Sequence, residues 1–182
     1  YAAAVWVRGN AESLGGDPSR IAVAGDSAGA TLSAVVSLLA RDRTGPELSC
    51  QVLFYPATDL SKFDTQSQRD FAEGYHLTRR YLEIFRSLYA PNPEDWKSPL
   101  ISPLFAPSLE RLPPAVVVTA QFDPLRDEGE AYASRLAAAG VPVVQKRYDG
   151  IVHGFLTLDR LFPQADEALA LAGTELKRLF AR

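Results

Sequence analysis

Three side chains in this sequence of 182 residues have the types that catalysis by a nucleophilic serine requires. Ser27 is the central residue of a G-x-S-x-G motif, and Asp123 and His153 follow later in the chain. A serine hydroxyl is a weak nucleophile unless a neighbouring base takes its proton and an acidic group orients that base. Together, the three residues could transfer an acyl group through a serine ester. The motif itself reads Gly25-Asp26-Ser27-Ala28-Gly29.

The segments on either side of the motif predict a strand that enters a sharp turn and a helix that leaves it. Ile21 to Ala24 is a short apolar run, typical of a buried strand. The segment from Leu32 to Leu39 predicts a helix with one face toward a core. The apolar residues at helical spacing are Leu32, Val35, Val36 and Leu39.

A strand, a turn and a helix in this order would hold the serine on a strained elbow with its hydroxyl exposed. We expect Gly25 and Gly29 to permit an approach of strand and helix that a side chain would block. The helix would also point its N-terminus at the site, where it can stabilise negative charge. The alternative is a Ser-Gly-rich loop without a role, since the motif alone is common by chance.

Three more segments predict strands, and helical segments alternate with them. The strands are expected within Gln51–Ala57, Ala115–Ala120 and Val143–Tyr148, and a helix is expected over about Gly129–Ala139. Strands that alternate with helices indicate parallel β-α units. We therefore predict an α/β fold with a mostly parallel sheet of about four strands and flanking helices.

The three candidate residues all follow predicted strands. Ser27 follows the first strand, Asp123 the third, and His153 lies in a glycine-flanked loop after the fourth. The C-terminal ends of parallel strands lie at one edge of a sheet, where α/β folds place their sites. The chain order Ser27, Asp123, His153 is that of the α/β-hydrolases and not that of the chymotrypsin or subtilisin folds.

Two other residues could take the supporting roles. Asp127 could replace Asp123 as the acid, but it lies about one helical turn later and is expected to cap the next helix. His76 could replace His153 as the base, but it precedes Asp123 and lies in an irregular segment, where a cap or pocket role explains it better. Asp123 could also simply start the turn before Pro124. Two histidines are too few for a typical catalytic zinc site, and no H-E-x-x-H motif is present.

A long insertion is expected between the second and third strands, from Asp59 to about Pro107. It contains one helical segment, Thr78 to Ala90, and many prolines after it. Long insertions between strands usually cover a site, so we expect this one to form a cap over Ser27. The helical segment has an apolar side that we expect to face apolar neighbours, formed by Tyr81, Leu82, Phe85, Leu88 and Tyr89.

Both ends of the chain predict helices. Tyr1 to Leu14 has the pattern of the end of a helix, with Val5, Leu14 and also Trp6 toward a core. A last helix is expected over about Gln164–Phe180. Its expected apolar stripe comprises Ala165, Ala168, Leu169, Ala172, Leu176, Leu179 and Phe180.

The composition is ordinary for a globular protein with a core, with 47% hydrophobic and 23% charged residues. A net charge of −3 and the absence of a basic block argue against nucleic acid and anionic membranes as partners. No apolar run is long enough to span a bilayer. Cys50 is the single cysteine, which excludes an internal disulfide and favours a reducing compartment such as the cytoplasm.

These motifs resemble those of the hormone-sensitive-lipase family of α/β-hydrolase esterases, also known as the bacterial family IV lipolytic enzymes. The resemblance rests on G-D-S-A-G at residues 25–29, D-P-L-R-D-E-G at residues 123–129 and H-G-F at residues 153–155. D-P-S-R-I before the first strand and S-P-L within the insertion are also similar. The resemblance therefore covers essentially the whole chain.

The resemblance implies a carboxylesterase that hydrolyses small-molecule esters, usually of short to medium acyl chains, with no cofactor. It implies Ser27 as the nucleophile, Asp123 as the acid and His153 as the base. The amide of Ala28 is implied as one oxyanion donor. The further motif and substrate-pocket residues that it implies are Gly25, Asp26, Gly29 and Phe155.

The chain also departs from the family. The H-G-G-G loop that supplies the family's other oxyanion amides has no counterpart, and Ala30 stands where the family frequently has glycine. The chain contains no methionine and opens within a helix-like segment. We therefore expect residues 1–182 to be a single catalytic domain without its N-terminal half. Such a chain should hydrolyse esters poorly by itself, because one lost oxyanion donor already costs roughly 10²–10³ in kcat.

Two other functions fit parts of the pattern. A truncated or inactive hydrolase-like module could bind partners or form a homo-oligomer through the sheet edge that Ile21–Ala24 would expose. The missing oxyanion loop favours this alternative, and the intact triad argues against it. A serine peptidase of the same fold is the third possibility, but the D-P-L-x-D-E segment favours an esterase.

Overall fold

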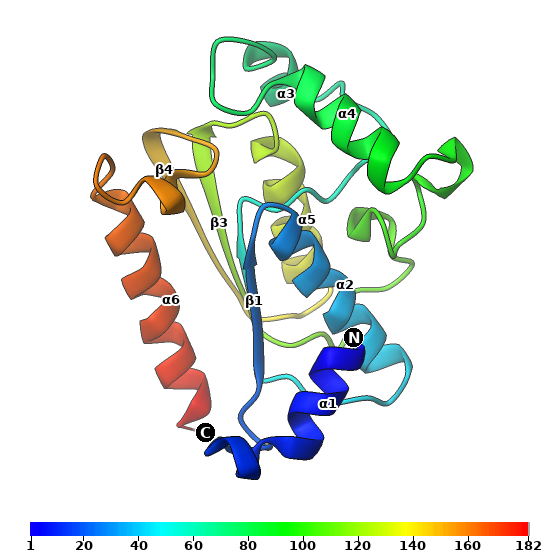
Figure 1. Ribbon diagram of the computed structural model, residues 1–182, viewed down its shortest axis with the longest axis vertical. Coiled ribbons are helices and arrows are strands. Elements are labelled where there is room, and N and C mark those ends of the chain that lie inside the picture. The colour runs from blue at the N-terminus through cyan, green and yellow to red at the C-terminus, as the bar shows by residue number, and fades with distance from the viewer. Residues whose placement is uncertain (182) are drawn as a thin grey trace.

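Four parallel strands form the central sheet, in the spatial order β1-β2-β3-β4 (Figure 1). The computed structural model describes residues 1–181. The register places Ala24 beside Val52 and Leu53 beside Val117. The predicted α/β fold with four parallel strands is confirmed. The strands are β1 (Ala22–Asp26), β2 (Cys50–Phe54), β3 (Ala115–Phe122) and β4 (Val143–Val152).

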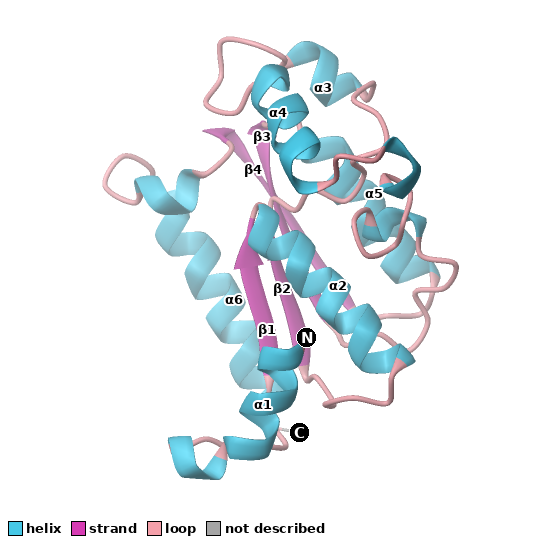
Figure 2. Cartoon of the chain, turned by 45° about the vertical axis from the view of Figure 1, so that its right-hand side comes forward, coloured by secondary structure: helices cyan, strands magenta, loops and turns pink. Residues whose placement is uncertain are grey.

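Helices cover both faces of this sheet, so the core has two halves (Figure 2). On one face, α2 (Ala28–Asp42) and α5 (Arg126–Ala138) pack against Leu53 and Val117. On the other face, α6 (Gln164–Phe180) packs against Val52 and Val116, after the 3₁₀ helix η4 (Phe155–Leu158). Successive residues of a strand point to opposite faces, and both faces are covered at the centre of the sheet, which is why β2 and β3 are nearly continuous apolar runs. The edge strands β1 and β4 are partly exposed.

Helix α2 buries a face that coincides only in part with its predicted apolar pattern, since Val35 of that pattern is buried. Ala30, Ala34 and Leu38 are buried in the core, whereas Leu32 is 51% exposed. The prediction that Leu32 faces the core is therefore wrong. Small residues four positions apart let α2 lie close to the sheet, and this orientation turns Leu32 toward a cavity instead.

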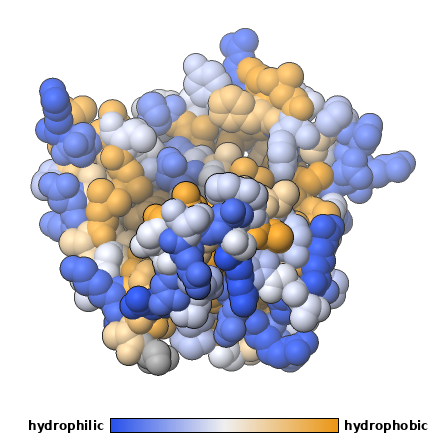
Figure 3. Space-filling view, turned by 60° about the horizontal axis from the view of Figure 1, so that its bottom comes forward, coloured by the Kyte–Doolittle hydropathy of each residue, from blue (hydrophilic) through white to orange (hydrophobic). Residues whose placement is uncertain are grey.

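Helix α1 (Ala2–Asn10) and the 3₁₀ helix η1 (Glu12–Leu14) bury none of their residues. Val5, Trp6 and Leu14 are between 44% and 60% exposed, so the prediction that they face a core is wrong. The helix lies near the end of the sheet where β1 begins (Figure 1), and within residues 1–181 no element covers its apolar side. Figure 3, which turns this end forward, shows apolar side chains on the surface among charged ones.

Helix α6 packs through the small residues of its predicted stripe. Ala165, Ala168 and Ala172 are buried, and Leu176 lies partly buried in the same cluster. Leu169 is exposed, so its assignment to the buried stripe is wrong, because the face that meets the sheet is narrower than the stripe. Among the described residues, neither α6 nor any other helix is both long and apolar enough to cross a membrane.

The insertion between β2 and β3 rises above the C-terminal ends of the strands (Figure 1). The helix predicted near Thr78–Ala90 is confirmed, and the Thr78 hydroxyl accepts the N–H of Tyr81 at its start. Within this helix Leu82 is buried, but the other residues of the predicted apolar side are exposed. The elements of the insertion are α3 (Gln66–Asp70), α4 (Arg79–Tyr89), η2 (Pro93–Asp95) and η3 (Pro103–Phe105).

Candidate active site

Ser27 lies in the turn between β1 and α2 with a backbone conformation that residues other than glycine rarely adopt. Its φ is 50° and its ψ is −119°. Its N–H donates to the carbonyl of Phe54 at the end of β2 (2.9 Å). Its carbonyl accepts the N–H groups of Ala30 and Thr31 in the first turn of α2 (3.0 and 3.1 Å). The strained residue is therefore held from both sides, as strain at a functional site requires.

The two glycines of the motif differ in what they permit. A Cβ atom on Gly25 would lie 2.3 Å from the carbonyl carbon of Gly29, so the strand and the helix could not approach as they do. A Cβ atom on Gly29 would meet nothing within 4 Å. The expectation that a side chain at either position blocks the elbow is correct for Gly25 and wrong for Gly29, because Gly29 points away from the strand.

The side chains of Ser27, His153 and Asp123 form one hydrogen-bonded line. Nε2 of His153 lies 2.9 Å from Oγ of Ser27, and Nδ1 of His153 lies 2.7 Å from Oδ2 of Asp123. An ionised carboxylate can only accept hydrogen bonds, so Nδ1 donates to Asp123 and Nε2 is left to accept the serine proton. The structure thus brings together, from three strand ends, the three residues singled out in the sequence.

The acid and the base of this line are shielded from solvent. Asp123 is 0% exposed and His153 is 6% exposed. Oδ1 of Asp123 accepts the N–H of Leu125 (2.8 Å), and the Asp123 carbonyl accepts the N–H of Arg126 (3.1 Å). Asp123 therefore does start a turn before Pro124, and this turn aims its second carboxylate oxygen at His153.

Tyr55 also supports His153, although no sequence pattern assigned it a role. The centroids of the two rings are 4.7 Å apart, and the Tyr55 backbone has a φ of 40°. Its hydroxyl donates to Oδ2 of Asp26 (3.3 Å). Burial raises the pKa of the Tyr55 phenol far above its usual range, so the ring beside the imidazole stays neutral. Its position at the end of β2, beside the strand that leads to Ser27, is the signal that could have identified it.

The other implied motif residues lie outside the reacting line. Asp26 is exposed at the end of β1, where it accepts the Tyr55 hydrogen bond. Phe155 is fully buried and packs against Tyr55 and Tyr148, with ring centroids 5.6 and 5.8 Å away. The structure thus places Phe155 in the core beneath α6, where it supports the loop that carries His153.

The two rival residues do not reach Ser27. Asp127 lies in the first turn of α5, and its Oδ2 accepts the N–H of Ser67 in α3 (2.8 Å). It therefore caps α3, and the prediction that it caps the helix that follows it is wrong. His76 is exposed, and its Nε2 lies 3.5 Å from where a Cβ atom on Gly154 would be. It borders the loop that carries His153 without joining the hydrogen-bonded line.

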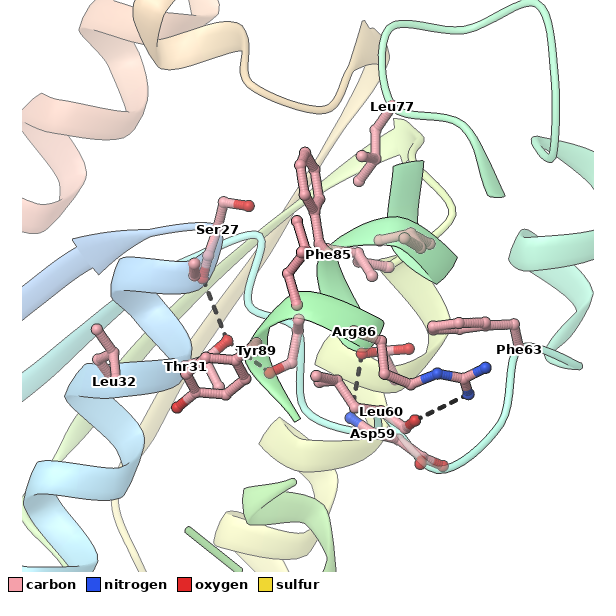
Figure 4. A pocket seen from close by; sticks show the side chains of 16 residues that line it. Ser27, Thr31, Leu32, Asp59, Leu60, Phe63, Leu77, Phe85, Arg86 and Tyr89 are labelled. Carbon is pink, nitrogen blue, oxygen red and sulfur yellow. Dashed lines mark hydrogen bonds between the residues drawn. The ribbon is translucent and has the colours of Figure 1, made fainter. Parts of the chain in front are cut away.

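A cavity of about 440 Å³ opens at Ser27 and extends between α2 and α4 (Figure 4). Its walls are mainly apolar, and they come from the elbow, from α2, from the insertion and from the start of α5. His153 and Asp123 are not among the lining residues. Side chains of α4 that are exposed to solvent, such as Phe85 and Leu88, therefore line this open cavity. The lining residues from α2 and the insertion are Ala28, Thr31, Leu32, Asp59, Leu60, Phe63, Leu77, Leu82, Phe85, Arg86, Leu88 and Tyr89.

Polar groups along this cavity already have partners in the protein. The Thr31 hydroxyl donates to the carbonyl of Ala57 (2.6 Å). The guanidinium of Arg86 donates to the carbonyl of Leu60 (3.2 Å) and lies over the rings of Phe63 and Trp96, at 4.3 and 3.7 Å from their centroids. Burial lowers the pKa of Arg86 from its usual value. The cavity is therefore suited to an apolar group.

The N-terminus of α2 lies beside the Ser27 hydroxyl. Ala28 is the first residue of the helix, and the first N–H groups of a helix have no acceptor within it. Such N–H groups, together with the helix dipole, stabilise a negative oxygen nearby. Among residues 1–181, no three His, Cys, Asp or Glu side chains are grouped so that they could hold a metal ion.

Sequence and structure comparisons agree on the relatives of this chain. Residues 1–157 match the alpha/beta hydrolase fold family. The chain is 42% identical over 181 residues to the carboxylesterase NlhH of Mycobacterium tuberculosis, a match that covers 98% of this chain and 56% of that protein. It is 41% identical to an arylesterase of Saccharolobus solfataricus, covering 99% of this chain and 58% of that protein.

Solved structures give the same result. The crystal structure of EstE1, a thermostable carboxylesterase from a metagenomic library, superposes with a TM-score of 0.94 at 44% identity. The superposition covers 98% of this chain and 61% of EstE1. The chain thus spans little more than half the length of the relatives that it matches.

Proposed function

The chain belongs to the α/β-hydrolase family and, within it, to the hormone-sensitive-lipase-like carboxylesterases. From this membership we propose that it is part of a serine carboxylesterase. The observation that carries the proposal is the hydrogen-bonded line from Ser27 through His153 to Asp123. The relatives named as carboxylesterases support the same reaction class. Residues 1–182 belong to the catalytic domain, and residues 59–107 act as part of its cap.

The reaction begins with Ser27. His153 accepts the serine proton at Nε2 while Oγ attacks the carbonyl carbon of the ester, and Asp123 stabilises the imidazolium that forms. The carbonyl oxygen becomes an oxyanion, and the N–H of Ala28 donates to it. Nε2 then gives its proton to the alkoxide oxygen, the alcohol leaves, and an acyl group stays on Ser27. Water repeats these steps to release the carboxylic acid.

The positions of the base and the cavity indicate how the ester is oriented. His153 must protonate the leaving alkoxide, so the alcohol part of the ester lies on the His153 side of Ser27. The cavity begins at Ser27 and Ala28 and is not lined by His153. The acyl chain therefore enters the cavity. The cavity, of about 440 Å³, has room for acyl chains of short to medium length, the range that the family resemblance implies.

Hydrolysis of p-nitrophenyl esters of graded acyl length tests this function. The chain is expressed together with whatever sequence precedes it in its source polypeptide, here called the complete polypeptide. We expect turnover with short and medium acyl chains, a decline with longer chains, and covalent labelling of Ser27 by a fluorophosphonate. A complete polypeptide that is folded but hydrolyses none of these esters would refute the proposal.

Two further expectations about the protein stay predictions. Because β1 lies at the edge of the sheet, residues 1–182 alone should self-associate through its unpaired backbone groups. Size-exclusion chromatography of this chain tests the expectation, and a monomer would contradict it. A cytoplasmic location rests on Cys50 as the single cysteine of the sequence, and fractionation of the source cells would test it.

A further inference from the structure

Glu128 is a buried carboxyl group that the mechanism above does not use. It is 2% exposed, and it borders the cavity. Its Oε1 accepts the N–H groups of Thr58 (2.7 Å) and Asp59 (3.1 Å), and its Oε2 accepts from Nε2 of Gln68 (2.7 Å). The Thr58 hydroxyl also donates to the Glu128 carbonyl (2.8 Å). One residue of α5 therefore holds the segment after β2 and helix α3 at the same time.

The orientation of Gln68 is fixed independently of Glu128. Its Oε1 accepts the N–H of Thr65 (3.0 Å), and its own N–H donates to Oγ1 of Thr65 (3.3 Å). This capping box decides which end of the amide faces α5. Nε2 must point at Glu128, so the side chain at position 128 has to accept a hydrogen bond there.

The groups that Glu128 holds are parts of the site. Asp59 lines the cavity, and so does Leu125, which lies just before α5 and three residues before Glu128. The same segment begins with Asp123, whose carbonyl accepts the N–H of Arg126. Helix α3 is tied to this segment a second time, because the Ser67 hydroxyl donates to the carbonyl of residue 124 (2.9 Å). The Glu128 carboxyl group is therefore bonded to the cavity wall and to α3, and it lies on the segment that begins with the proposed catalytic acid.

A charged group at this place has a cost that an apolar side chain would avoid. Burial raises the pKa of Glu128 well above its usual range, the N–H groups of Asp59 and Thr58 oppose this shift, and the carboxylates of Asp59 and Asp123 add to it. Buried charges are often replaceable by apolar groups without loss of stability. The acceptor pattern around Glu128 is therefore better explained by positioning than by stability.

We propose that Glu128 is a positioning residue for the reaction, which fixes the cavity wall at Thr58–Asp59 and helix α3 relative to Asp123. The proposal rests on the esterase function proposed above. It assigns to the Glu of the D-P-L-R-D-E segment a task distinct from that of the Asp at its start. Misplacement of a wall or an acid by about 1 Å can cost roughly 10²-fold in rate.

An exchange of donor and acceptor between positions 68 and 128 tests the proposal in the complete polypeptide. Glu128→Gln places an amide NH₂ against the NH₂ of Gln68, and we expect kcat/KM to fall roughly 10- to 100-fold. Adding Gln68→Glu places a carboxylate oxygen at position 68 opposite the new amide at position 128, so one donor again faces one acceptor. The other carboxylate oxygen keeps the capping box, and most of the loss in kcat/KM should be recovered. Glu130→Gln, on the same helix, where the carboxylate accepts from the Thr119 hydroxyl (3.1 Å), should leave kcat/KM unchanged.

Three readouts separate positioning from stability. These are kcat and KM for a short and a medium ester, the unfolding temperature, and hydrogen exchange of residues 58–60 and 66–70. Recovery by the double variant, with faster exchange in Glu128→Gln alone, supports the proposal. If Glu128→Gln lowers the unfolding temperature but leaves kcat/KM unchanged, the proposal is overturned.

Two further outcomes are also decisive. If Glu128→Gln does not fold, the double variant decides: a folded double variant with near-native kcat/KM supports the proposal, and an unfolded or inactive one overturns it. If the unaltered complete polypeptide shows no turnover, the esterase function fails separately. Unchanged hydrogen exchange of residues 58–60 and 66–70 in Glu128→Gln would then overturn the positioning role as well.

Discussion

The triad and the cavity wall meet at Ser27, but the protein holds them in different ways. His153 and Asp123 are buried and follow directly after strands of the sheet. The wall formed by α4 is exposed, with Phe85 at 56% and Leu88 at 77%. His153 and Asp123 are therefore held in place by the main core, whereas the α4 wall is attached to the outside of that core. For the proposed esterase, this difference predicts that the geometry of the reacting groups is rigid and that the choice of acyl chain is adjustable.

The attachment of α4 shows how loosely the second region is held. Leu82 is its buried residue, within a small cluster that includes Phe63, Leu77 and Leu125 and is separate from the two main halves of the core. Arg86 adds its contacts with the rings of Phe63 and Trp96. Segments with few buried contacts open more readily than strands at the centre of a sheet.

The largest effect is expected from Ser27→Ala in the complete polypeptide. The substitution removes the attacking oxygen, so kcat should fall by roughly 10⁴- to 10⁶-fold, with little change in the unfolding temperature. Steady-state kinetics and thermal unfolding measure both quantities. Ser33→Ala is the matched control, because that hydroxyl donates to the Gly29 carbonyl on the same helix (2.9 Å) and takes no part in the reaction. An active Ser27→Ala protein that serine inhibitors still block would exclude Ser27 as the nucleophile.

An intermediate effect is expected from Gly25→Ala, which breaks the rigid region without touching a reacting atom. The added methyl group would meet the backbone of Gly29, so the elbow must shift. We expect a loss of about 1–3 kcal/mol in the free energy of unfolding and a fall of roughly 10²-fold in kcat. The methyl group added by Gly29→Ala meets no other atom, so this variant should keep the free energy of unfolding and the kcat of the unaltered protein. Equal behaviour of the two variants in urea unfolding and ester hydrolysis would contradict the assigned elbow geometry.

The smallest effect is expected from Phe85→Ala, which alters the adjustable region alone. Loss of this ring from the cavity wall should lower kcat/KM for a medium-chain ester by roughly tenfold and leave the acetate ester nearly unchanged. A profile of kcat/KM against acyl length measures the change. Ile84→Ala is the control on α4, since Ile84 is exposed and does not line the cavity. A profile that Phe85→Ala leaves unmoved would remove α4 from acyl-chain selection.

The sequence by itself determined the fold class and the strand ends at which the candidate residues stand. Local patterns were sufficient here, because a buried parallel strand is a short apolar run and the chain order of Ser27, Asp123 and His153 follows the order of the strands. It also indicated the helix of the insertion, through the spacing of residues such as Leu82 and Phe85. These features depend on residues that are neighbours in the sequence.

Tertiary structure decided which side of each helix is buried and which polar groups meet. Leu32 and Val5 fit an apolar face equally well in the sequence, yet one turns to the cavity and the other lies exposed on α1. Glu128 and Gln68 are 60 positions apart, and their hydrogen bond depends on how α3 docks on α5. Periodicity shows that a helix has an apolar side, but burial and hydrogen-bond partners are properties of the surfaces that pack against it.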